Sequence, residues 1–299
     1  LLLPAARSRP GGGRPRRGGN GRRVSLVALL LAAASLAGTT QRLQMPAPAL
    51  GQEYRDVRVY LPPSYSRPES ATRRYPVVYL LHGWPGSEGD WFTRGHAPET
   101  VDAMIAAGTI PEVILVGPDG NGRGVLGRSL YVNSYDGRSP VEEFIVRDVV
   151  RWTDATFRTR PDPAARAIVG LSDGGTGAFN AALRHPDVFG ACGSLSGNFT
   201  LGREFGIGNV VGPEPGAAAR LAAASPALYV AEVVPVTKRL KLYFDCGADD
   251  ESIADNRAFH ALLERLGVPH TFREFPGTHT WGYWRAHLRD ALEVVTAGM

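Results

Sequence analysis

One serine in this chain has the local sequence of an activated nucleophile. Ser172 is the central residue of a Gly-x-Ser-x-Gly pattern that runs from Gly170 to Gly174. In a tight turn between a strand and a helix, this pattern holds the serine hydroxyl exposed. An apolar run at residues 167–169 predicts the strand, and an Ala-rich stretch at residues 178–184 predicts the helix. We therefore expect Ser172 to attack an electrophilic carbonyl carbon.

A serine hydroxyl reacts well only when a neighbouring base takes its proton. Among seven histidines, His279 is best placed, because it lies between the last predicted strand and the last predicted helix. That is where the base belongs when the chain order is nucleophile, acid, base. The acid is expected after the preceding strand, where Asp249 and Asp250 both lie on the loop. Spacing alone does not separate these two carboxylates.

Acyl transfer through a serine also requires two N–H groups that bind the developing negative charge on the substrate oxygen. One is expected from the backbone of Asp173, the residue after the nucleophile. The other is expected from the backbone of Trp84, in the loop that follows a predicted strand at residues 77–81. These two residues are the predicted oxyanion hole.

Several large or polar side chains could line a substrate pocket beside these groups. For each of them the alternative is that it packs a loop against the core. The candidates are Trp91, Tyr131, Asn133, Tyr135, Trp281 and Trp284. No cofactor is expected for this chemistry, and no set of Cys, His and carboxylate residues has the spacing of metal ligands.

A second motif, Gly-x-Gly-x-x-Gly at residues 122–127, is typical of dinucleotide binding when a helix follows it. The residues that come next, 128–133, indicate a loop instead. No helix N-terminus is therefore expected to receive a pyrophosphate there, and dinucleotide binding is disfavoured.

The order of elements after residue 52 predicts the fold. An alternating pattern predicts a strand at 54–61, and apolar runs predict strands at 77–81, 113–116 and 167–169. Three more strands are predicted at 191–195, 240–245 and 271–275. Helices are predicted at 140–157, 178–184, around 258–266 and at 281–295. Alternating strands and helices predict an α/β fold with a mostly parallel sheet covered on both faces. In such sheets the reacting groups lie on loops at the carboxyl ends of the strands.

The first 50 residues differ from the rest in composition. Seven arginines and no acids lie within the first 23 residues, and a mostly apolar run follows at 24–37. The run has the length of a signal-peptide core, is too short to span a bilayer, and ends in small residues suited to cleavage. We expect export to the envelope or medium, by the general or the twin-arginine route. Residues 1–50 are predicted to be a signal-like or disordered segment and a linker, and residues 52–299 one domain.

The charge pattern argues against a nucleic-acid partner. The net charge of +4 is smaller than the contribution of the seven N-terminal arginines, so residues 24–299 are slightly acidic. The two cysteines, Cys192 and Cys246, both fall in predicted buried strands. We expect them to be free core residues.

With these residues identified, the sequence resembles the esterase family that includes S-formylglutathione hydrolase, feruloyl, acetyl-xylan and enterochelin esterases, and the antigen 85 mycolyltransferases. The resemblance extends from about Tyr54 to the last helix. The stretches that carry it are Val59–Pro63, Tyr75–Gly83, Asp90-Trp91, Phe144–Thr159, Gly170–Gly175, Leu183–Pro186, Cys246–Asp250 and Gly277–Trp281.

This resemblance implies an α/β-hydrolase fold and a Ser172–His279–Asp250 catalytic triad, because the family's acid falls on Asp250. It implies hydrolysis of a carboxylic ester through an acyl-enzyme. One residue departs from the family, which often has Met after the nucleophile, whereas this chain has Asp173. A carboxylate there could oppose the charge that develops in the oxyanion hole.

Two other functions are compatible with the same residues. A sugar hydroxyl could replace water as the acyl acceptor, as in the mycolyltransferases, which would make the protein an acyltransferase. The protein could instead be a non-catalytic carbohydrate- or lipid-binding protein on the same fold, although the retained Ser172 and His279 argue against this. The predicted export favours an environmental or cell-envelope ester, with a small-molecule, carbohydrate or lipid part, over cytosolic S-formylglutathione.

Overall fold

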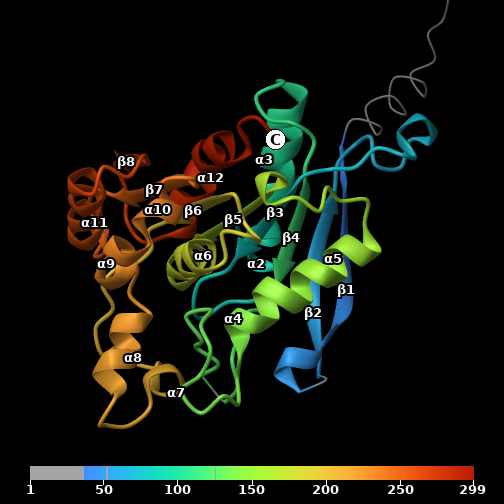
Figure 1. Ribbon diagram of the computed structural model, residues 1–299. Coiled ribbons are helices and arrows are strands. Elements are labelled where there is room, and N and C mark those ends of the chain that lie inside the picture. The colour runs from blue at the N-terminus through green and yellow to red at the C-terminus, as the bar shows by residue number, and fades with distance from the viewer. Residues whose placement is uncertain (1–36, 52, 125) are drawn as a thin grey trace, which may run out of the picture. The chain divides into compact units, whose positions relative to one another are not determined.

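The computed structural model describes residues 37–51, 53–124 and 126–299. These residues contain one eight-stranded sheet with the strand order β1-β2-β4-β3-β5-β6-β7-β8 (Figure 1). β2 is antiparallel to both of its neighbours, β1 and β4, and all other pairs are parallel. The strands are β1 (Thr39–Ala47), β2 (Glu53–Leu61), β3 (Val77–Leu81), β4 (Ile114–Pro118), β5 (Arg166–Leu171), β6 (Ala191–Leu195), β7 (Lys241–Gly247) and β8 (Thr271–Phe275).

Helices cover both faces of this sheet. The first set packs on one face and comprises α2 (Asp90–Thr93), α3 (Ala97–Ala106) and α12 (Trp281–Thr296). The second set packs on the other face and comprises α4 (Val141–Glu143), η3 (Phe144–Val149), α5 (Val150–Thr156), α6 (Asp173–Arg184) and α11 (Ile253–Arg265). The predicted α/β architecture is therefore confirmed.

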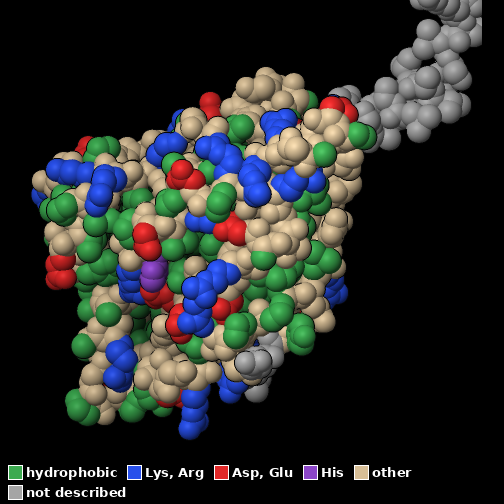
Figure 2. Space-filling model, turned by 45° about the vertical axis from the view of Figure 1, so that its right-hand side comes forward, with side chains coloured by type: hydrophobic (Ala, Val, Ile, Leu, Met, Phe, Trp, Pro, Cys, Tyr) green, Lys and Arg blue, Asp and Glu red, His purple; other side chains and the backbone are tan. Residues whose placement is uncertain are grey.

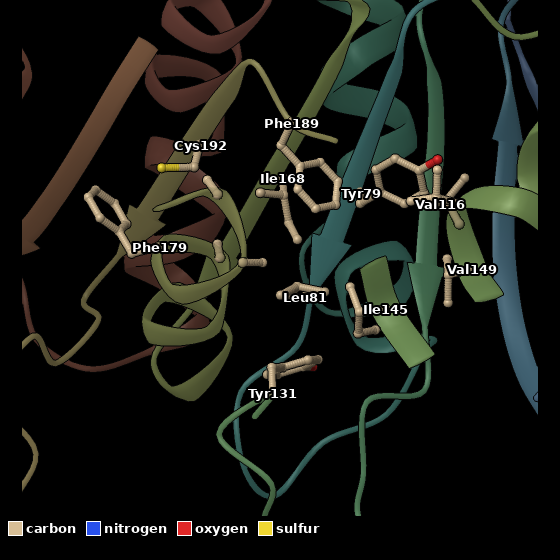
Figure 3. Close-up of a cluster of buried hydrophobic side chains, with 14 of the residues drawn as sticks. Tyr79, Leu81, Val116, Tyr131, Ile145, Val149, Ile168, Phe179, Phe189 and Cys192 are labelled. Carbon is tan, nitrogen blue, oxygen red and sulfur yellow. The ribbon is translucent and has the colours of Figure 1, made fainter. Parts of the chain in front are cut away.

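The buried strands supply side chains to both faces in alternation. Tyr79 and Leu81 of β3 pack with Ile168 of β5 on the α6 side, where Phe179 and Phe189 complete the cluster (Figure 3). The alternate residues of the same strands, such as Val78, belong to the opposite cluster under α3 and α12. Strands with apolar residues on both faces read as continuous apolar runs, which is why the sequence predicts them so closely.

The structure corrects the predicted domain boundary. Residues 39–50, which the sequence pattern assigns to the N-terminal segment and linker, form β1 and the short 3-10 helix η1 (Pro48–Leu50). β1 pairs with β2 along its whole length, and Met45, Ala47 and Leu50 are fully buried in the core. Only the apolar residues at the end of β1 reach the core, so its sequence carries little strand signal. The predicted signal peptide lies almost wholly outside the described residues.

The predicted helix at 140–157 is present but not uniform. α4 and α5 are joined by η3, a six-residue π-helix. Asp148 of η3 is buried and accepts a hydrogen bond from the backbone N–H of Ala49 at 2.7 Å. This contact attaches the residues that follow β1 to the helix.

A segment of short helices separates β6 from β7. Its helices are α7 (Gly208–Val211), α8 (Ala217–Ala223), α9 (Pro226–Tyr229), η5 (Val230–Val233) and α10 (Val234–Thr237). α7 and α8 lie beyond the carboxyl ends of the strands (Figure 1). Among the described residues no single helix is long and apolar enough to cross a bilayer. Two consecutive segments, Ala217–Ala223 and Pro226–Thr237, which are bent relative to each other, meet this criterion of length and composition only when they are taken together.

Further short helices, η2 (Pro68–Ser70) and η4 (Pro163–Ala165), lie in the loops before β3 and β5. Cys192 and Cys246 are buried and free, as predicted.

On the face that Figure 2 shows, lysine and arginine side chains lie among acidic and hydrophobic ones rather than forming one unbroken basic surface.

Candidate active site

Ser172 lies in the tight turn between β5 and α6. Its backbone has φ 52° and ψ −125°, a conformation that non-glycine residues rarely adopt. A Cβ added to Gly170 would lie 2.1 Å from the carbonyl oxygen of Gly174, and one added to Gly174 would lie 2.4 Å from that of Leu81. Both positions therefore require glycine, because the helix begins directly against the neighbouring strand.

The structure brings Ser172, His279 and Asp250 together at the carboxyl edge of the sheet. The His279 Nε2 atom lies 2.9 Å from the Ser172 Oγ atom. On the other side of the ring, Nδ1 lies 3.1 and 3.0 Å from the two carboxylate oxygens of Asp250. A hydroxyl, an imidazole and a carboxylate in this order can move a proton from the hydroxyl to the ring.

Asp250 differs from its neighbour Asp249 in environment. The Asp250 side chain is fully buried, whereas Asp249 is exposed. Burial would raise the pKa of Asp250, but hydrogen bonds from His279 and from the backbone N–H of Ser252 hold that pKa below its usual value. Asp250 is therefore ionised at neutral pH and accepts the Nδ1 hydrogen of His279.

The predicted oxyanion residues lie beside Ser172. A Cβ added to Gly83 would lie 3.2 Å from the Ser172 Cβ atom, so the loop after β3 passes directly over the serine. Trp84 follows in this loop and lines the same pocket as Ser172. Asp173 is the first residue of α6, where helical N–H groups have no partner within the helix.

His82 supports this loop rather than reacting. Its side chain is buried, its Nδ1 atom lies 2.8 Å from the Gly83 carbonyl oxygen, and its Nε2 atom accepts from the backbone N–H of Gly120 at 3.1 Å. These two contacts join the loop after β3 to the loop after β4 through the His82 side chain.

A pocket of about 530 Å³ opens over Ser172 and His279. Besides Trp84, its wall includes Trp281 and Trp284, whose rings pack edge to face at 5.3 Å. The guanidinium of Arg94 lies 5.0 Å over the Trp281 ring and also lines the pocket. Trp284 additionally packs against the His279 ring at 4.9 Å, so the same aromatic side chain contacts both the base and the pocket.

Four of the six predicted substrate residues do not line this pocket. Trp91 is 1% exposed, and its indole N–H donates to the Leu81 carbonyl oxygen. Its ring packs edge to face against the ring of Trp281. Tyr131 is buried and donates to the His82 carbonyl oxygen. The Asn133 side chain accepts from the Glu143 N–H at the start of the helix that follows. Tyr135 is 46% exposed and lies under the Arg220 guanidinium, outside the pocket. Of the six candidates, Trp281 and Trp284 line the pocket.

One residue beside the site, Arg128, is not marked by any sequence pattern. Arg128 makes two hydrogen bonds to the carboxylate of Asp173. The two residues are far apart in the chain. Arg128 follows the Gly-x-Gly-x-x-Gly motif, and the described residues of that motif form no helix and precede none directly. Among the described residues no three His, Cys, Asp or Glu side chains are grouped to hold a metal ion.

Comparison with known proteins identifies the family. The family model described as Putative esterase matches residues 47–294. The chain belongs to this family. An esterase of Mycobacterium tuberculosis (strain H37Rv) is 29% identical over 255 residues, which cover 75% of this chain and 52% of that protein. The chain thus spans about half the length of that relative.

Two further proteins to which this chain is similar are named as feruloyl or ferulic acid esterases. An endo-1,4-beta-xylanase/feruloyl esterase of Xylanibacter ruminicola is 35% identical over 150 residues, covering 49% of this chain and 20% of that protein. A solved ferulic acid esterase superposes with a TM-score of 0.76 at 29% identity and covers 87% of this chain and 98% of the solved one. The esterase-family chain therefore has the α/β-hydrolase fold that the resemblance implies.

Proposed function

We propose that this esterase-family protein hydrolyses carboxylic esters through an acyl-enzyme on Ser172. The observation that carries the proposal is the 2.9 Å contact between the Ser172 hydroxyl and His279 Nε2, with buried Asp250 on the far side of the imidazole. Membership of the esterase family and similarity to a ferulic acid esterase support the same reaction.

In the first half of the reaction, Ser172 Oγ attacks the ester carbonyl carbon while its proton passes to His279 Nε2. The N–H groups of Asp173 and Trp84 bind the oxyanion of the tetrahedral intermediate. Asp250 accepts the Nδ1 hydrogen and stabilises the imidazolium. Collapse of the intermediate breaks the bond to the alcohol oxygen, which takes the proton from His279.

In the second half, His279 removes a proton from water, whose oxygen attacks the acyl carbonyl carbon of the acyl-enzyme. The second tetrahedral intermediate collapses, and Ser172 Oγ leaves with the proton that His279 returns. The carboxylic acid is released and the enzyme is restored. Every proton in this cycle passes through His279, so no metal or organic cofactor enters it.

We propose esters of aromatic acids, of the feruloyl type, as substrates. The edge-to-face tryptophans Trp281 and Trp284 offer a flat apolar ring a surface directly beside Ser172. The similar feruloyl and ferulic acid esterases act, by their names, on the same class of acid. We also propose that the protein acts outside the cytoplasm, on the basis of the apolar run and small residues at 24–38.

A fluorophosphonate probe and an ester series test this proposal. The wild-type protein is expected to be labelled, and to hydrolyse methyl ferulate with a higher kcat/KM than p-nitrophenyl palmitate. Ser172→Ala should abolish labelling and lower kcat by about 10⁴-fold or more, because the nucleophile is lost. Ser66→Ala, at an exposed serine outside the pocket, is the matched control and should behave as wild type. A folded wild-type protein that is neither labelled nor active would refute the proposal.

A further inference from the structure

The carboxylate of Asp173 lies next to the proposed oxyanion hole but is not free. Arg128 Nε donates to one of its oxygens at 2.7 Å, and Arg128 Nη2 donates to the other at 2.8 Å. The two side chains are 9% and 8% exposed. A paired geometry of this kind fixes both orientation and distance more strongly than a single hydrogen bond.

The same guanidinium contacts two other segments. Arg128 Nη1 donates to the Phe205 carbonyl oxygen at 2.7 Å, and Nη2 also donates to Glu204 at 2.5 Å. The guanidinium carbon lies 5.1 Å over the ring of Trp84. Arg128 thus touches both predicted oxyanion residues, Trp84 and Asp173, and connects them to the segment that precedes α7.

This arrangement has an electrostatic consequence. An unpaired buried carboxylate at position 173 would repel the negative charge that forms on the substrate oxygen, because screening is weak where water is excluded. Glu204 is 34% exposed and its charge is partly screened. Burial alone would lower the pKa of the Arg128 guanidinium, but the hydrogen bond and charge of Asp173 hold that pKa above its ordinary value. Arg128 therefore carries the positive charge that neutralises Asp173.

We propose that Arg128 is a positioning residue for the oxyanion hole, which neutralises the Asp173 carboxylate and holds Asp173 and Trp84 in one orientation. The inference rests on the proposed function and deepens it. The acid beside the proposed oxyanion hole has a buried cationic partner of its own.

A double-variant series tests the inference. Arg128→Met leaves the Asp173 carboxylate buried and unpaired, and should lower kcat at least about 10-fold with KM changed less than about 3-fold, since the interaction acts on the transition state. The double variant R128M/D173M removes both charges and should regain kcat to within about 3-fold of wild type. A merely structural arginine would lower Tm in R128M but leave kcat near wild type at temperatures where the variant is folded.

Arg166→Met is the matched control. Arg166, at the opposite end of β5 from the nucleophile, pairs with Asp154 at 2.5 Å and is 8% exposed. Its loss should lower Tm without lowering kcat, and Tm is measured for every variant. The inference fails if folded R128M keeps the wild-type kcat, or if R128M/D173M is as slow as R128M. A wild-type protein that hydrolyses no ester would instead overturn the proposed function, and this inference with it.

Discussion

Asp249 and Asp250 show how strongly environment separates two adjacent identical residues. Asp249 is exposed, and its backbone N–H donates to the Gly277 carbonyl oxygen. Asp250 is buried, and its carboxylate contacts His279 through both oxygens. The exposed residue helps fix the loop, and the buried one is positioned to orient the base. The spacing of the two along the chain carries none of this information, because both lie on the same loop.

Asp250→Asn should lower kcat by about 10³- to 10⁴-fold while leaving the fold intact. The amide has nearly the shape of the carboxylate but cannot stabilise the imidazolium, and it favours the wrong tautomer of His279. Asp249→Asn is the matched control and should retain kcat within about 2-fold. Steady-state kinetics on one p-nitrophenyl ester decide the matter, and equal losses in the two variants would contradict the assignment of Asp250.

Residues of the candidate site were predictable only where a local sequence pattern marks them. Ser172 lies in a recognisable turn motif, and His279 in the loop between the last strand and the last helix. Arg128 has neither, because its partners Asp173 and Glu204 lie 45 and 76 residues away. Three aromatic candidates, Trp91, Tyr131 and Tyr135, failed for a related reason. Trp91 and Trp281 pack against each other, and no sequence pattern says which of the two faces the pocket.

Among the elements, the turn from β5 to α6 depends most on residue size. A Cβ on Gly174 would meet the carbonyl oxygens of Leu81 and His82 at 2.4 and 2.5 Å. Backbone oxygens of a central strand and its loop have little room to move. The absence of a side chain at this position therefore sets how closely α6 approaches β3, and with it the direction of the Ser172 hydroxyl.

Gly174→Ala should destabilise the protein by at least about 2 kcal/mol and lower kcat, because the overlap separates α6 from β3. Gly202→Ala provides the control, since a Cβ there meets no atom within 4 Å, and its Tm should match that of wild type. Thermal unfolding and kinetics of both variants would test this. A Gly174→Ala protein with wild-type Tm and kcat would show that the turn can adapt.

Strands buried on both faces were predictable from their own composition, whereas β1 was not. β3, β5 and β6 are uninterrupted buried runs, and their predicted positions are correct to within two residues. β1 is mostly exposed along its first six residues, so its pairing with β2, rather than its own composition, makes it a strand. The short helices between β6 and β7 likewise depend on tertiary contacts, because isolated helices of this length are not stable.

For the molecule as a whole, the parallel sheet determines where chemistry occurs. Ser172 follows β5, Asp250 follows β7 and His279 follows β8, so three loops distant in sequence meet at one edge. This convergence follows from the alternation of strands and helices, and could be predicted. The strand order and the distances within the site could not, because they depend on how the helices pack.

The same sheet edge holds a second buried carboxylate with a different role. Asp245 is fully buried and accepts hydrogen bonds from the hydroxyls of Tyr243 and Tyr283 at 2.7 and 2.8 Å. Tyr283 lies against Gly277, two residues before His279. Burial raises the pKa of Asp245 to about 7, although the two tyrosine hydrogen bonds lower it. In the unfolded chain an aspartic acid has a pKa near ~3.9.

Asp245 should therefore make the free energy of unfolding decrease as pH rises from about 4 to about 7. In that interval the folded protein binds a proton at Asp245 that the unfolded chain has released, so stability is fully present below the unfolded pKa and is lost as pH rises toward the folded one. Asp245→Asn removes this titration. Relative to wild type, the variant should gain up to a few kcal/mol between pH 4 and 7, whatever its stability at pH 4. Urea unfolding of both proteins at several pH values measures the difference, with the exposed-residue variant Glu232→Gln as control. A difference that stays constant with pH would mean that Asp245 is ionised in the folded state throughout, held so by its two tyrosines.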